Sequence, residues 1–207
     1  MLSKIYLIVI LTSTLIGLYY YKALPQYLKY LSIALVCTLL VELIAFFVIK
    51  RNIWFFNIFL VFEFPFYIWL YRQILTSERQ KKIIVYFLTI QFIAALLNLF
   101  FFQGLFKFNN YSYALGCILI CICSLFYYTN LLQSPQPQAL KKLPMFWIST
   151  GHLIYYSCNF FLTGLLNYIM SINLDLAKQL FAITMGLNII MYTLFSVGIV
   201  CSTSRQK

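Results

Sequence analysis

The chain has 207 residues, of which 63% are hydrophobic and 9% are charged, and its mean hydropathy is +0.89. Soluble globular domains carry about one quarter charged residues, so this composition excludes that class. The net charge is +11, but the Lys and Arg residues fall almost entirely between apolar runs. Such a distribution is typical of membrane topology signals and lipid headgroup contacts, and we predict no nucleic-acid binding.

Seven apolar runs follow one another along the chain, each close to the ~20 residues that a helix needs to cross a bilayer. Continuous runs of this length favour helices over the alternating segments of about ten residues that form membrane barrels. We therefore predict an all-α, polytopic membrane protein, a single domain over residues 1–207 that folds as a seven-transmembrane-helix bundle. The predicted helices cover residues 5–24, 30–49, 53–71, 83–106, 112–132, 144–165 and 179–202.

Basic residues between the runs predict the orientation, because Lys and Arg accumulate in cytoplasmic segments. Ten follow the odd-numbered runs: Lys22, Lys29, Arg72, Arg79, Lys81, Lys82, Lys141, Lys142, Arg205 and Lys207. Five lie on the other side: Lys4, Lys50, Arg51, Lys107 and Lys178. The bias places the N-terminus outside and the C-terminus in the cytoplasm.

Three ionisable side chains fall inside predicted helices, where such groups are costly and by default mark function. Glu42 lies in the second helix, Glu63 in the third and His152, the only histidine, in the sixth. A rise of about 1.5 Å per residue puts Glu42 about 12 Å below the outer boundary, and Glu63 and His152 both about 18 Å below it. We predict that Glu63 and His152 form a pair near the bilayer midplane.

Polar residues extend this pattern at helical spacing. Tyr155 and Asn159 share a face with His152, while Asn98 and Asn188 come level with Glu42 in the fourth and last helices. Such residues either bond across helices and hold the bundle together, or they line a cavity that opens outward. The second reading predicts ligand- or proton-binding at Glu42, Glu63, His152, Asn98, Tyr155, Asn159 and Asn188.

Pro65 follows Glu63 within the third helix. Proline has no N–H, so the carbonyl of Val61 lacks its helical donor, and the helix is expected to kink there. We predict a hinge at Pro65.

The sequence predicts no metal and no cofactor. All six cysteines lie in apolar runs, and the i, i+4 pair Cys117 and Cys121 is more typical of tight helix packing than of a soft-metal site. One histidine cannot supply the usual ligands of a catalytic zinc. The last run contains no lysine in its middle for a retinal Schiff base.

Three motifs resemble a family of small uncharacterised bacterial seven-transmembrane-helix proteins. They are Glu42, the Nx5E spacing from Asn57 to Glu63, and the FWI..G.LIY.S pattern of residues 146–157. The resemblance implies a sensory or accessory component of the bacterial inner (plasma) membrane. The Pro-Gln dipeptides at residues 25–26 and within 134–138 are similar to those of PQ-loop transporters, which place them inside helices; here they lie at or beyond helix ends.

No segment between predicted helices exceeds about a dozen residues, which leaves no room for a soluble effector domain. We therefore expect a receptor-like or accessory protein whose outer polar pocket binds a small ligand or proton. It would act through a separate signalling or effector protein, with membrane lipids around it. Two alternatives stay open, a small-solute or proton-coupled transporter and an intramembrane lipid-acting enzyme; enzyme activity is the less favoured expectation.

Overall fold

The structure, a computed structural model, describes residues 2–48, 53–133 and 139–204. Throughout these ranges the regular elements are helices, without strands. They are α1 (Leu2–Tyr19), α2 (Gln26–Phe47), α3 (Ile53–Arg72), α4 (Glu78–Leu97), α5 (Asn110–Leu132), α6 (Pro144–Gly164), α7 (Leu166–Ile172) and α8 (Leu174–Ser204). Within the described ranges, six helices are long and apolar enough to cross a membrane: α1, α2, α3, α4 with its C-terminal extension, α5 and α8. The prediction of an all-α, multi-pass membrane bundle is confirmed.

Helix α6 is not among these six candidate membrane spans. Its 21 residues are long enough to span and include no Asp, Glu, Lys or Arg, so it falls short on hydropathy alone. The cause is a high content of polar side chains, His152 and Asn159 among them, most of which are buried. A seventh span at α6 stays a prediction.

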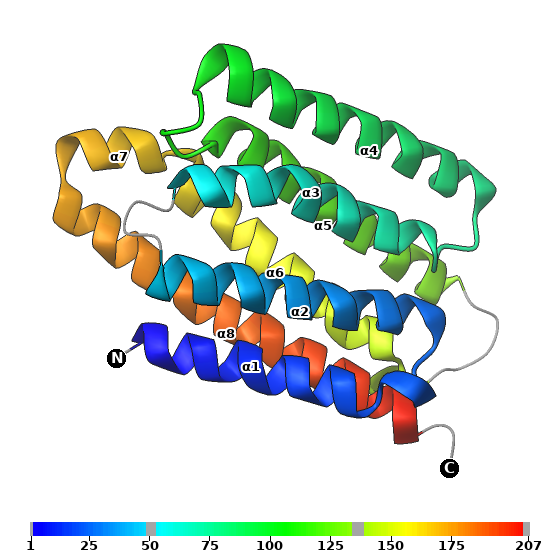
Figure 1. Cartoon of the computed structure of the whole chain (residues 1–207). Helices are drawn as coiled ribbons and strands as arrows, with labels where there is room; N and C mark the ends of the chain where they lie inside the picture. The colour runs from blue at the N-terminus through cyan, green and yellow to red at the C-terminus, as the bar shows by residue number, and fades with distance from the viewer. Residues whose placement is uncertain (1, 49–52, 134–138, 205–207) are drawn as a thin grey trace.

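The long helices alternate in direction, so the two chain ends lie at opposite ends of the bundle (Figure 1). We call these ends the N-terminal end, where α1 begins, and the C-terminal end, where α8 stops. Helix α6 packs between α5 and α8, α1 lies along α8 and α2, and α4 covers α3 and α5. The long helix that falls short on hydropathy therefore packs inside the bundle.

Several predicted helix bounds are wrong. The second and fourth helices begin at Gln26 and Glu78, before the predicted residues 30 and 83. The first helix stops at Tyr19 and continues only as a 3-10 turn at Tyr21–Ala23; Leu24 is then extended, as expected for the residue before Pro25. The fourth helix does not reach residue 106: it gives way at Asn98–Phe102 to a π-helical turn, followed by Gly104 at φ +74°. Positive φ is natural for glycine and ends the helix there.

The predicted connection between residues 166 and 178 is largely helical. It forms α7, and α8 then begins at Leu174 instead of residue 179. The side chain of Asn173 explains this early start, since its Oδ1 accepts the N–H groups of Asp175 and Leu176, each at 3.0 Å. An Asn at this position caps the free N–H groups of a new helix.

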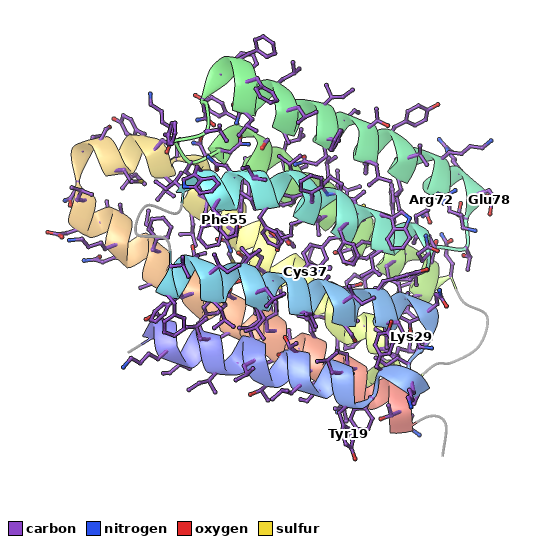
Figure 2. All side chains as sticks on the ribbon, in the orientation of Figure 1. Tyr19, Lys29, Cys37, Phe55, Arg72 and Glu78 are labelled. Atoms are coloured by element: carbon purple, nitrogen blue, oxygen red, sulfur yellow. The ribbon has the colours of Figure 1, made fainter. Side chains whose placement is uncertain are left out.

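Basic residues gather at the C-terminal end of the bundle, where Figure 2 labels Lys29 and Arg72. In the described ranges, eight Lys and Arg flank the helix ends there: Lys22, Lys29, Arg72, Arg79, Lys81, Lys82, Lys141 and Lys142. Three described ones belong to the N-terminal end: Lys4, Lys107 and Lys178. Lys50, Arg51, Arg205 and Lys207 lie outside the described residues, as does the Pro-Gln pattern of 134–138.

Candidate functional site

A cavity of about 540 Å³ occupies the half of the bundle next to the N-terminal end. It reaches from Tyr156 and Met191 in the interior to Ser3, Phe46 and Ile53 near the start or end of their helices. Its wall combines α1, α2, α3, α5, α6 and α8 with Phe108, which precedes α5. This volume falls in the range of small-molecule binding sites, about 300–1,000 Å³.

Of the seven residues predicted to bind a ligand or proton, four line this cavity: Glu42, Glu63, Tyr155 and Asn188. They come from α2, α3, α6 and α8, so the bundle gathers residues that lie far apart in the sequence. The other three, Asn98, His152 and Asn159, lie outside its lining.

The two carboxyl groups of the cavity differ in their surroundings. The hydroxyl of Tyr6 on α1 donates a hydrogen bond of 2.7 Å to Oε1 of Glu42. Among the residues that the structure describes, no side chain or backbone group donates a hydrogen bond to Glu63, and no ion pair reaches it. Glu63 therefore presents its full acceptor capacity to the cavity.

Aromatic side chains form the floor. The rings of Phe64 and Tyr113 meet edge to face, with centroids 5.1 Å apart, and Phe64 also contacts Tyr156 at 5.6 Å. The hydroxyls of Tyr113 and Tyr155 share a hydrogen bond of 3.1 Å. Edge-to-face packing is a preferred geometry of aromatic pairs, so these contacts and the hydrogen bond orient the rings and hydroxyl groups of the floor.

The predicted Glu63–His152 pair is wrong. His152 is fully buried, and its Nδ1 shares a hydrogen bond of 2.9 Å with the hydroxyl of Tyr71, two turns beyond Glu63 on α3. Its ring packs edge to face on Tyr67 and Phe195, with centroids 4.8 and 5.1 Å apart. This cluster, which we call the His152 plug, closes the bundle between the cavity and the C-terminal end.

Asn98 and Asn159 do not line the cavity; each forms hydrogen bonds with neighbouring side chains instead. Asn98 starts the π-helical turn and donates a hydrogen bond of 2.8 Å to Oε1 of Gln103. Asn159 is fully buried and accepts a hydrogen bond of 3.0 Å from the hydroxyl of Thr184, which does line the cavity. Asn159 thus supports the cavity wall from behind: it holds Thr184, and its Nδ2 donates a hydrogen bond of 3.0 Å to the carbonyl of Tyr155.

Pro65 lies inside α3, which runs without interruption from Ile53 to Arg72. The helix therefore continues through Pro65 beside the cavity, and a hinge at this position stays a prediction.

Asn57 has a role that the sequence did not reveal. It is fully buried on α3, its Nδ2 donates to the carbonyls of Leu105 and Lys107 at 2.8 and 2.6 Å, and its Oδ1 accepts the N–H of Asn109 at 3.1 Å. One side chain thus holds the whole segment between α4 and α5. That segment carries Phe108 into the cavity wall.

Further amides tie the same segment to α7. Gln103 Nε2 donates to Oδ1 of Asn110, whose Nδ2 donates to the carbonyl of Gly164 at 2.7 Å. Asn167 donates to the carbonyl of Phe108 at 2.8 Å and to Oδ1 of Asn110 at 3.0 Å. With Asn57 these residues form the amide cluster, which joins α3, α5 and α7 beside Phe108 of the cavity wall. In the sequence, the adjacent residues Asn109 and Asn110 are the available signal for this cluster. An Asn-Asn pair by itself indicates only a break between helices.

Asn57→Ala is expected to lower the free energy of unfolding by about 1–2 kcal/mol, because it leaves two carbonyls and one N–H without their partner. The loss is moderate since water at the bundle end can replace part of these bonds. Hydrogen exchange of the Asn109 N–H should also quicken. Gln133→Ala, which removes an exposed amide at the C-terminal end, serves as the control. Unchanged exchange at Asn109 would contradict the role given to Asn57.

The donor set of the cavity suits an organic ligand better than a metal ion. Across the described ranges, no group of three or more His, Cys, Asp or Glu side chains is placed to hold a metal. The cavity offers two carboxyls, tyrosine and threonine hydroxyls and one amide among aromatic rings. Comparisons with protein-family models, curated proteins and solved structures find no match to this chain.

Proposed function

We propose that this chain is a receptor-like or accessory membrane protein that binds a small ligand in the cavity and acts through a partner protein. The observation that carries the proposal is Glu63, a carboxyl without a described donor on the wall of a 540 Å³ cavity inside an apolar bundle. Such a group costs stability unless it acquires a partner, and ligand binding would supply one.

The proposed topology has seven spans, with α6 crossing the membrane inside the bundle. An odd number of spans agrees with chain ends at opposite ends of the bundle. The C-terminal end, with eight described basic residues against three, would face the cytoplasm of a bacterial inner membrane. The cavity would then open toward the outside.

Helix α3 supplies a physical route from ligand to partner. It carries Glu63 on the cavity wall, Tyr71 in the His152 plug and Arg72 at the basic end. A ligand that binds Glu63 can shift the whole helix. The basic segment 72–82, which a cytoplasmic partner would contact, would move with it. The two states of α3 would differ in contacts at both ends, as coupling between sites requires.

Transport of a small solute is the second candidate, and Pro65 favours it. Pro65 lies two residues after a cavity carboxyl and less than two turns before Tyr71 of the His152 plug, so a bend of α3 there would gate alternating access. In that case Glu63 would carry a proton or contact the solute.

Met185→Trp tests the binding function by filling the cavity, which Met185 lines from α8. Thermal unfolding would be followed in nonionic detergent with a cation, a neutral compound and an anion of similar size: benzyltrimethylammonium, benzyl alcohol and benzenesulfonate. We expect at least one to raise the Tm of the native chain by several degrees and to lose that effect in Met185→Trp.

Ile190→Trp is the matched control, because Ile190 lies on the same helix, is 46% exposed and does not line the cavity. It should keep the full Tm shift. Ala45→Leu fills the cavity from α2 and replaces Met185→Trp should the tryptophan prevent folding. Equal shifts in the native chain and both filled variants, or no shift with any compound, would refute the proposal. Uptake of the stabilising compound into proteoliposomes, abolished by Glu63→Gln, would establish transport instead.

A further inference from the structure

The cavity is lined by acidic side chains, whereas the chain as a whole is basic. Two of the four acidic residues line it, whereas none of its described lining residues is Lys or Arg. Glu42 receives one hydrogen bond, from Tyr6, and Glu63 receives none from the described residues. A group that enters this cavity therefore meets carboxyl oxygens without a competing cation of the protein.

The rest of the wall is aromatic to an unusual degree. Eleven of its 24 lining residues are Phe or Tyr, whereas the whole chain has 21 Phe and 17 Tyr among 207 residues. Ring faces attract cations through their quadrupole, most strongly where water is excluded, and several rings around one site recognise ammonium groups. Phe59, beside Glu63 on α3, and Phe181, on the facing α8, bring such rings from both sides.

We propose that the ligand is an organic cation, an amine or quaternary ammonium compound whose charge lies between Glu42, Glu63 and the surrounding rings. This inference rests on the function proposed above and specifies its ligand class. The cavity is far larger than an ammonium group alone, so the cation carries an apolar body. Thr163, Thr184 and Asn188 can bond a polar substituent on the wall formed by α6 and α8.

Calorimetric titration of the purified chain in nonionic detergent tests the ligand class with the same three compounds. Benzyltrimethylammonium should bind at least tenfold more tightly than benzyl alcohol, and benzenesulfonate most weakly. Glu63→Gln should weaken binding of the cation about tenfold or more and leave that of benzyl alcohol unchanged, because only the cation uses the charge. Glu78→Gln, which removes an exposed carboxyl at the start of α4, should change neither.

The aromatic contribution has its own matched pair on α3. Phe59→Leu keeps an apolar side chain in the cavity and removes the ring, so cation affinity should fall about threefold. Phe62→Leu, at a position 63% exposed on the outer surface of the bundle, should have no effect.

The outcomes separate the two proposals. Binding of benzyl alcohol or benzenesulfonate as tight as that of the cation, still blocked by Met185→Trp, would overturn the cation inference and leave the binding function standing. Binding of the cation that Glu63→Gln does not weaken would also overturn the inference. Failure of all three compounds to bind the native chain would refute the binding function itself.

Discussion

Tyr71→Phe is expected to lower the free energy of unfolding by about 2–3 kcal/mol, although it removes a single oxygen atom. The Tyr71 hydroxyl is fully buried and lies 2.8 Å from Ser124 Oγ, 2.9 Å from His152 Nδ1 and 3.3 Å from Ser149 Oγ. His152 Nε2 has no partner among the described residues. The substitution would therefore leave the imidazole without any hydrogen bond, and a buried unsatisfied polar group is expensive.

Tyr86→Phe is the control, since Tyr86 is 68% exposed on α4 and should tolerate the change. The sharper comparison adds His152→Leu, which removes the group that Tyr71→Phe would leave unsatisfied. In the His152→Leu variant, adding Tyr71→Phe should lower the free energy of unfolding by at least about 1 kcal/mol less than it does in the native chain. Chemical unfolding in detergent micelles measures all four variants. Additive losses would show that the two side chains do not depend on each other.

Gly116→Ala is expected to cost about 2–3 kcal/mol and to weaken ligand binding as well. A Cβ atom at Gly116 on α5 would lie 2.6 Å from Cε1 and Cγ of Phe64, a ring that is 1% exposed. Tyr113 and Tyr156 hold this ring on two sides, so the space that it can enter is the cavity. Overpacking of this kind typically costs 1–3 kcal/mol.

Gly186→Ala is the matched control on α8, because no atom lies within 4 Å of a Cβ atom built there. It should leave stability unchanged or raise it slightly, since alanine favours helix more than glycine does. The native chain and both variants would be compared by thermal unfolding and by the Tm shift with benzyltrimethylammonium. A stable Gly116→Ala variant with full ligand response would show that Phe64 has another space to move into.

Apolar runs predicted most helix positions to within a few residues, because hydropathy marks the segments that prefer lipid. Two of the helix ends that were predicted wrongly involve hydrogen bonds of individual polar side chains. The turn at Asn98 includes a hydrogen bond between the side chains of Asn98 and Gln103, and the cap at Asn173 depends on side-chain bonds to two backbone N–H groups. Composition reports neither. Segment 166–172 is helical although the sequence only suggested a connection.

For the candidate site, the polar spacing in α2, α3, α6 and α8 identified Glu42, Glu63, Tyr155 and Asn188, which share one cavity. The depth estimated for His152 from the helical rise per residue was wrong, because that estimate assumes that every helix runs parallel to the membrane normal. Helix α6 crosses the bundle obliquely (Figure 1), and His152 comes level with Tyr67 and Tyr71, one to two turns away from Glu63.

The amide cluster could not be predicted from the sequence, for a different reason. Asn57 binds backbone atoms about 50 residues away, at Leu105 and Lys107. Such partners have no side-chain signature, so their positions follow only from the packed fold. The sequence showed an asparagine in a helix and two in a connection, but not that they meet.

The polarity of α6 has a consequence for how the protein is made. In the proposed seven-span topology, a nascent α6 would have to leave the insertion machinery with His152 and Asn159 facing lipid, which the bilayer opposes. In the packed bundle these side chains are covered by α5, which precedes α6 in the chain, and by α8, which follows it. In that topology, stable membrane entry of α6 would depend on the arrival of α8, and the cavity, whose wall includes both helices, would form only after α8 has been made.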